Sequence, residues 1–355
     1  MSRAGLVGAA LAVALACTRG ETPPAHGGGH PGVAWRSRLE RDHQLVGRIY
    51  DVAQRKEVSE GELVDALAGA RFAILGEHHE NEDHHLLQAR LLRALVARGR
   101  APAVAFEMLT RDVQPALDAA LAAPAPNAEA VRVATAWETS GWPPFALYAP
   151  IFEAALAAGL PLVAADLAPA ERRQLGSDES LPAPLRARLG LDEQLPAEVQ
   201  RGLEQDLLAA HCDELPASAL PRLVRVQRGR DAELAQALLD AAGADGLPAD
   251  SADESAELGA SAEERATSGL AAVLVAGAEH ARRDRGVPRA LARLAPGAAV
   301  TSLALLEVSP DVRAPLADVD ARAGAEPVFD YVWYTPRASD EDYCERMKRS
   351  PRGAP

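Results

Sequence analysis

The stretch that decides the fold is FAILGEHH, residues 72–79. Four apolar residues precede Gly76 and Glu77, and this order predicts a buried strand that ends in a sharp turn. A related stretch, AAVLVAGAEH, occupies residues 271–280. In open α/β sheets, ligands bind just beyond the carboxyl ends of the strands. The two GxxH motifs, Gly76–His79 and Gly277–His280, therefore predict one polar site built from distant parts of the chain.

Other apolar runs, bounded by turn residues, extend this pattern along the chain. Helical periodicity lies between them and is clearest in residues 85–96, for which Asn81 is the expected N-cap. Alternation of this kind predicts an α/β fold with a mostly parallel sheet flanked by helices. The expected buried strands are Phe72–Leu75, Ala103–Phe106, Leu160–Ala165, Ala271–Ala276 and Val300–Val308.

Charged side chains follow four of these strands. Glu77 and His79 end the first, Glu107 the second and Asp166 the third, while Glu279 and His280 end the fourth. Because parallel strands share one direction, these groups are expected to gather at one edge of the sheet.

Composition restricts the class of partner. The chain has 355 residues and a net charge of −14, which argues against duplex nucleic acid as the main partner. Much of the acidity lies in residues 240–268, which contain almost no large apolar residue. Such a segment cannot offset its ordering entropy by burial, so we expect a disordered acidic loop there.

The N-terminus has the pattern of an export signal. Arg3 precedes a short apolar core that ends in Ala14-Leu15-Ala16-Cys17, which is similar to a bacterial lipobox. We expect residues 1–17 to be a signal peptide, Cys17 to be lipidated, and residues 18–35 to form a flexible tether. The protein would then be anchored by lipid to a membrane of the bacterial cell envelope.

The remaining chain divides into a domain and a tail. We expect one α/β domain over residues 36–336, with an α-helical insertion at 169–239 and a loosely held tail at 337–355. Cys212 and Cys344 could pair in an oxidising compartment, but their spacing does not establish a bridge.

Several motifs together resemble the ChaN-like family of bacterial iron-regulated, haem-binding lipoproteins, within the wider Tiki/TraB/erythromycin-esterase grouping. The resemblance covers roughly residues 45–308. The motifs are GEHH at 76–79, NEDHHLLQARLLRAL at 81–95, AFEMLTRDVQPAL at 105–117, WETSGW at 137–142 with Tyr148, His211-Cys212, and AGAEHARRDRGVPRAL at 276–291.

The resemblance implies haem binding in iron or haem uptake, without catalysis, by a homodimer that holds two stacked haems. We expect Tyr148 to be the iron ligand, since a phenolate oxygen holds ferric haem and needs an adjacent donor or cation. Trp142 would form part of an apolar wall, and His84 and His85 would contact haem from the first turn of a helix, where solvated side chains are an equal alternative. Tyr331 and Tyr334 form a rival aromatic cluster in what looks like an edge strand.

The alternative function is a metal-dependent hydrolase of the Tiki or esterase type. Glu77, His79, Glu107 and His280 would hold Zn, Mn or Fe, and Glu77 or Glu107 would act as the catalytic general base. The same four residues could instead form a buried hydrogen-bonded network that holds loops together. Residues 282–285, RRDR, could bind propionates or a substrate carboxylate, or could be surface charge.

Overall fold

The structure is a computed structural model and describes residues 33–177, 180–243, 269–323 and 327–349. The expected signal peptide, Cys17, most of the tether and residues 244–268 of the expected acidic loop lie outside the described residues. Val33 and Trp35, which were assigned to the tether, pack against the core. Within the described ranges no helix is both long and apolar enough to span a membrane.

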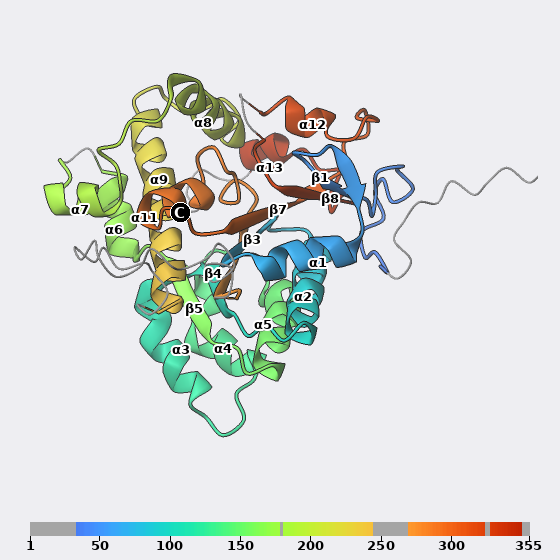
Figure 1. Cartoon of the computed structure of the whole chain (residues 1–355). Helices are drawn as coiled ribbons and strands as arrows, with labels where there is room; N and C mark the ends of the chain where they lie inside the picture. The colour runs from blue at the N-terminus through green and yellow to red at the C-terminus, as the bar shows by residue number, and fades with distance from the viewer. Residues whose placement is uncertain (1–32, 178–179, 244–268, 324–326, 350–355) are drawn as a thin grey trace, which may run out of the picture.

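An eight-stranded sheet of the order β2-β1-β8-β7-β3-β6-β4-β5 forms the centre of the described structure (Figure 1). All pairings from β8 to β5 are parallel, while β1 pairs antiparallel with both β2 and β8. The strands are β1 (Ile49–Asp51), β2 (Lys56–Val58), β3 (Phe72–Glu77), β4 (Ala103–Thr110), β5 (Leu162–Asp166), β6 (Ala272–Gly277), β7 (Val300–Glu307) and β8 (Tyr331–Thr335). The predicted α/β class with a mostly parallel sheet is confirmed.

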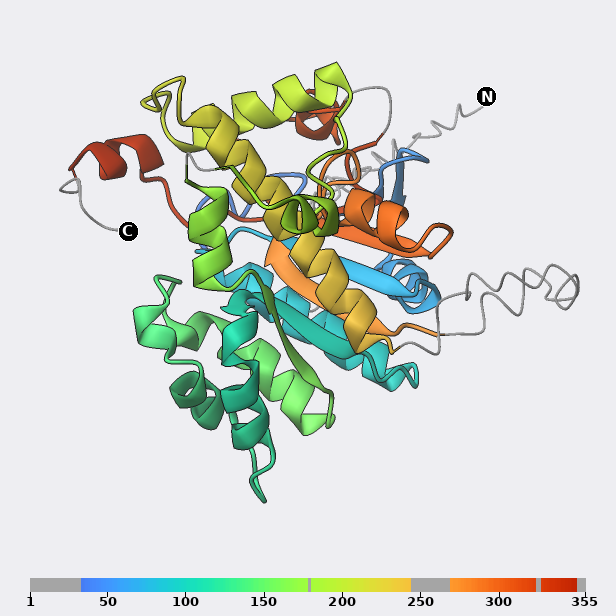
Figure 2. The same cartoon turned by 90° about the vertical axis from the view of Figure 1, so that its left-hand side faces the viewer.

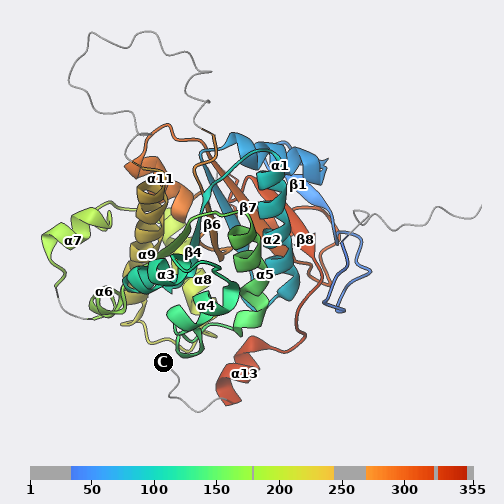
Figure 3. The same cartoon turned by 90° about the horizontal axis from the view of Figure 1, so that it is seen from below.

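Alternate residues of the buried strands enter two separate cores. Ala73 and Leu75 of β3 face the layer of α1 (Glu60–Gly69), α2 (Glu82–Ala97) and α5 (Phe145–Ala157). Phe72 and Ile74 face α9 (Leu220–Ala241) and α11 (Val287–Leu294). Because successive side chains of a strand point to opposite faces, the continuous apolar run FAIL serves both cores of a three-layer fold. Figure 2 shows α9 crossing in front of the sheet, and Figure 3 shows α2 beside α5.

The region between β5 and β6 is mainly helical. It contains α6 (Pro169–Leu175), α7 (Ala183–Arg188) and α8 (Ala197–Ala210), and then α9. α9 packs on β4, β5 and β6, so the last helix of the expected insertion is a layer of the sheet fold itself. The remaining short elements are η1 (Arg111–Val113), α3 (Gln114–Leu121), α4 (Ala128–Ala134), η2 (Trp137–Thr139), α12 (Ala317–Asp320) and α13 (Tyr343–Arg349).

Two details of the C-terminal part differ from expectation. β8 was expected to be an edge strand, but it lies between β1 and β7, because residues 49–58 form a hairpin that extends the sheet. The tail was expected to be loosely held, but Cys212 and Cys344 form a disulfide that ties α13 to the turn after α8, with Cα atoms 5.5 Å apart.

Candidate functional site

The two GxxH turns lie side by side at the carboxyl edge of the sheet. β3 and β6 are parallel neighbours, and Glu77 is opposite Gly277. A Cβ on Gly76 would lie 2.8 Å from the Cβ of Ala281, and a Cβ on Gly277 would lie 2.9 Å from Nε2 of His79. Both glycines are therefore required for the turns to pack together, and motifs about two hundred residues apart form one site.

Glu77 is the centre of the first half of the site. Its side chain is fully buried, and its Oε1 accepts a hydrogen bond from the Tyr148 hydroxyl at 3.1 Å and lies 2.8 Å from Nδ1 of His79. Its Oε2 contacts Nε2 of His85. Burial alone would raise the pKa of Glu77, but His85 and His79 lower that pKa to about 2. Glu77 is therefore ionised and already shared among three side chains.

His79 connects this half to the surface. Its side chain is 32% exposed, whereas those of Glu77, Glu107 and His280 are at most 4% exposed. The ring meets that of Trp142 edge-on, with centroids 4.8 Å apart, and Nε2 lies 3.9 Å from Oε2 of Glu107. Burial opposes protonation of the ring, but Glu107 and Glu77 outweigh it and raise the pKa of His79.

Glu107 organises the second half. Its Oε2 accepts from the backbone N–H of Gly277 at 2.6 Å, and its Oε1 accepts from Arg230 at 2.7 Å and lies 3.2 Å from Nε2 of His280. Arg230 also donates to Asp166, with an Nη2–Oδ2 distance of 2.9 Å. Burial opposes ionisation, but His280, Arg230 and His79 hold the pKa of Glu107 well below its usual range. Glu107, Asp166 and His280, which follow three of the expected strands, are thus brought together and paired.

His280 is held between two carboxylates. Nε2 faces Glu107, while Nδ1 lies 2.6 Å from Oδ1 of Asp231, a residue of α9. Burial favours the neutral ring, but Glu107 and Asp231 raise the pKa of His280 to about 10. The second GxxH histidine is therefore a buried cation at neutral pH.

This arrangement gives no support to the metal alternative. Among the described residues, no group of three or more His, Cys, Asp or Glu side chains could hold a metal ion. The physical reason is that the Arg230 guanidinium lies against Glu107 and Asp166, so their oxygens are occupied by a cation of the protein itself. The four proposed ligands instead contact one another and their neighbours in a largely buried polar network, as the alternative interpretation of these residues expected.

The residues expected to touch haem lie at very different depths. Tyr148, His84 and His85 are fully buried, so the alternative of solvated first-turn histidines is wrong. The Tyr148 ring packs against His85 and Trp137, with centroids 4.1 and 5.0 Å apart, and burial and Glu77 raise its pKa. If Tyr148 is to bind iron, a neighbouring group must favour its phenolate form. The neighbouring group is instead the carboxylate of Glu77, which disfavours the phenolate.

His84 and Trp142 complete this comparison. His84 accepts a hydrogen bond from the backbone of His78 at 2.8 Å and its Nε2 lies 2.8 Å from the Thr335 hydroxyl. Burial lowers its pKa well below the usual range, so it is a neutral residue that ties α2 to β8. The predicted N-cap is confirmed, since the Asn81 side chain accepts from the N–H of Asp83. Of the four expected haem contacts, only Trp142 is partly exposed.

Sequence reasoning missed Arg230 and Asp231, which supply one cation and one anion to the network. The available signal was a set of charged residues among the apolar positions of α9, where Asp231 and Glu233 are buried beside Leu234. Glu279 was expected to join the same group. It instead contacts Arg285 and Arg322 on the other side of the turn.

The comparisons with known proteins agree with this architecture. The family model described as "Haem-binding uptake, Tiki superfamily, ChaN" matches residues 63–291. A solved structure entitled "Cofacial heme binding to ChaN of Campylobacter jejuni" has 19% identity and a TM-score of 0.58, covering 80% of this chain and 95% of that one, so it shows a shared fold. No curated protein matches the chain.

Two further structures match more weakly. The type III effector HopBA1 has 14% identity and a TM-score of 0.37, covering 77% of this chain and 91% of that chain. An erythromycin esterase mutant in its open conformation has 17% identity and a TM-score of 0.36, covering 79% and 81%. Both TM-scores are too low to support a conclusion about this chain. The family model covers well over half of the sequence, and the chain therefore belongs to the haem-binding uptake family of the Tiki superfamily that includes ChaN.

Proposed function

We propose that this protein binds haem at the surface where His79 and Trp142 meet, and carries it without catalysing a reaction. Family membership supports a haem-binding function associated with uptake. The observation that carries the choice of surface is the exposure of His79, whose imidazole reaches solvent from an otherwise buried network. His79 would supply a nitrogen ligand to the iron of a bound haem.

The surroundings of His79 suit a histidine that binds iron. Nδ1 of His79 lies 2.8 Å from Oε1 of Glu77, which orients the ring, while Nε2 makes no hydrogen bond to a described residue and lies 3.9 Å from Oε2 of Glu107. A carboxylate behind the imidazole is the usual arrangement for a metal-ligating histidine. Trp142 offers an apolar face beside the ring. Tyr148 then serves to hold Glu77, because its hydroxyl donates to that carboxylate.

The pairing of the network carboxylates supports a carrier. Glu107 and Asp166 are paired with Arg230, and Glu77 is shared by Tyr148, His79 and His85. A carboxylate that is already paired in this way is a poor general base, because the partners that stabilise its charged form also lower its proton affinity.

Titration of the purified protein with haemin, followed at the Soret band, tests this proposal. We expect saturable binding, weakened by about tenfold or more in His79→Ala, with Tyr148→Phe changing the affinity less than about threefold. Because a protonated imidazole cannot bind iron and the pKa of His79 is raised, haem affinity should increase as pH rises above neutral.

The outcomes separate the hypotheses. If Tyr148→Phe abolishes the Soret change and His79→Ala leaves it intact, haem binding holds and the ligand is the tyrosine. If haemin produces no saturable change with the wild-type protein, the proposed function is wrong. Arg93→Gln, an exposed position on α2, is the matched control and should bind as the wild type does.

We further propose that the protein acts in the bacterial cell envelope, anchored through Cys17. The Cys212–Cys344 disulfide supports an oxidising compartment, because disulfides are rare in the cytosol. In cells fed radioactive palmitate we expect the wild type to be labelled and Cys17→Ala to be unlabelled. An unlabelled wild type, or equal labelling of both proteins, would contradict the anchor.

A further inference from the structure

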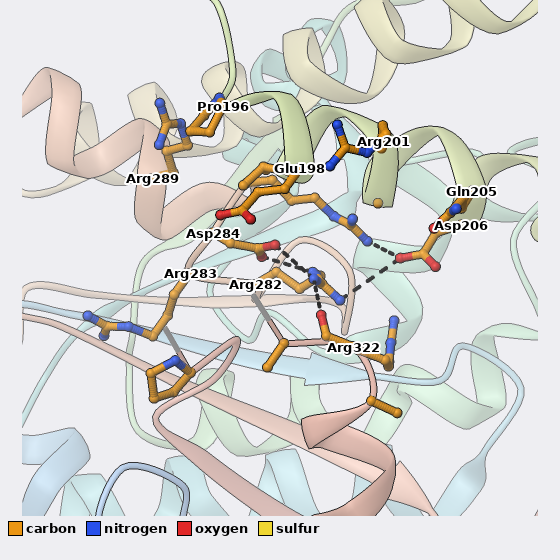
Figure 4. A pocket seen from close by; sticks show the side chains of 16 residues that line it. Pro196, Glu198, Arg201, Gln205, Asp206, Arg282, Arg283, Asp284, Arg289 and Arg322 are labelled. Atoms are coloured by element: carbon orange, nitrogen blue, oxygen red, sulfur yellow. Dashed lines mark hydrogen bonds and ion pairs between the residues drawn. The ribbon is translucent and has the colours of Figure 1, made fainter. Parts of the chain in front are cut away.

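A cavity of about 650 Å³ lies between α8, the segment that follows β6 and the end of α12. Figure 4 shows the side chains that line it. Its lining includes three acidic residues and twice as many arginines, so the cavity is cationic. This is unusual in a chain whose net charge is −14. The lining contains six arginines, which are Arg201, Arg282, Arg283, Arg285, Arg289 and Arg322.

Arg282 is the central residue of the cavity. Only 2% of its side chain is exposed, and its Nε and Nη2 donate to Asp284 at 2.9 and 2.8 Å (Figure 4). Nη1 is buried and has no hydrogen-bond partner among the described residues, since the carboxylate of Asp206 is 3.9 Å away. A buried N–H group without an acceptor is costly, and an anion oxygen in the cavity would supply that acceptor.

Two further arginines come from different elements. Arg201 projects from α8 and is exposed, and no hydrogen bond or ion pair joins it to any described residue. Arg322 follows α12 and pairs with Glu279. Guanidinium groups that approach from three separate elements suit a tetrahedral oxyanion, which presents oxygens in several directions, better than a planar carboxylate.

Two acidic residues near this group, Asp206 and Glu279, are already paired with an arginine. Arg285 contacts Asp206 and donates to Glu279 at 2.8 Å. Gly202 of α8 allows this close approach, since a Cβ there would lie 3.2 Å from Nη1 of Arg285. The carboxylates of Asp206 and Glu279 are therefore engaged by arginines, which reduces their repulsion of an incoming anion.

We propose that this cavity binds a soluble small molecule that carries a phosphate group. The volume is within the range of small-molecule sites, about 300–1,000 Å³. None of the network residues Glu77, His79, Glu107 or His280 lines it, so the cavity is separate from the surface proposed for haem. The segment from Gly277 to Arg285 takes part in both, since Gly277 donates to Glu107 of the network and residues 282–285 line the cavity.

Calorimetric titration with pyrophosphate at constant ionic strength tests this inference on the purified protein. We expect one site per chain, with affinity reduced about tenfold in Arg322→Gln and about threefold in Arg201→Gln. The side chains of Arg322 and Arg201 reach solvent, so both variants are expected to fold. Circular dichroism of each variant is the check on folding. Arg93→Gln has the same charge change outside the cavity and should bind like the wild type.

Two other probes make the result specific. Citrate should bind more weakly than pyrophosphate, and the haemin titration should be unchanged in Arg322→Gln. The inference is overturned if pyrophosphate does not bind, if all three arginine variants bind it equally, or if citrate binds and pyrophosphate does not. Loss of haemin affinity in Arg322→Gln would also overturn it, because the cavity would then belong to the haem site.

Discussion

The two GxxH motifs share a sequence pattern and lie on neighbouring parallel strands, yet their histidines have different environments. His79 is 32% exposed and is oriented by one carboxylate at 2.8 Å. His280 is 4% exposed and is held between Glu107 and Asp231, which keep it charged at neutral pH. The first motif presents a side chain to the surface, while the second stabilises the interior.

The difference comes from what packs against each turn. α9 lies over the second motif and brings Asp231 and Arg230 to it, whereas the first motif meets the helix that begins at Phe145 and the partly exposed Trp142. A local motif therefore specifies where a histidine lies in the fold, and the neighbouring elements decide whether it can reach a ligand.

The largest expected effect follows from removing the cation that both Glu107 and Asp166 require. Arg230→Met removes the guanidinium that Glu107 and Asp166 share, and both carboxylates are buried, so the free energy of unfolding should fall by about 3–5 kcal/mol. Urea unfolding followed by circular dichroism measures this change. Arg173→Met on α6 is the control, because Arg173 is exposed and its loss should cost less than about 0.5 kcal/mol.

A fall of similar size in both arginine variants would contradict the central role of Arg230. The same experiment sharpens the comparison of the two motifs if haemin titration is added. Arg230 contacts the second half of the site and not His79, so a folded fraction of Arg230→Met should still bind haemin.

A smaller, pH-dependent effect is expected for His280→Gln. The folded pKa of about 10 lies above the ordinary value of 6.5, so the charged ring contributes its full stability below pH 6.5. That contribution is lost as pH rises toward 10. The difference in unfolding free energy between wild type and variant should therefore be about 1.5–3 kcal/mol at pH 6 and should shrink at higher pH.

His79→Gln provides the contrast in this second measurement. Because His79 is partly exposed, its replacement should lower the unfolding free energy by less than about 1 kcal/mol at the same pH. If the two glutamine variants show the same loss and the same pH dependence, the proposed difference between the motifs is wrong.

The sequence was sufficient for the parts of the fold that depend on local pattern. Apolar runs bounded by turn residues located the strands β3 to β7 to within a few residues, and charged residues at their ends indicated the polar edge of the sheet. The hairpin of β1 and β2 was missed, because three-residue strands carry too little periodicity to be distinguished from loop.

The sequence predicted only some of the residues of the candidate site. Glu77, His79, Glu107 and His280 do lie together, as the edge argument expected. Arg230 and Asp231 were missed because a helix that contributes charges from a buried face resembles a solvated amphipathic helix when read alone. The expectation that Tyr148 ligates iron beside a donor or a cation did not anticipate the carboxylate next to its hydroxyl.

The sequence by itself determined the α/β class and the polar groups at one sheet edge, because strand periodicity and glycine turns are local properties. Its family followed separately, from the motifs that resemble ChaN and from the family model. Only the tertiary structure decided which of those groups reaches solvent, which pKa values are shifted, and that the buried Arg282 lines a cavity. Burial and charge pairing arise between segments far apart in the chain, and no local pattern contains them.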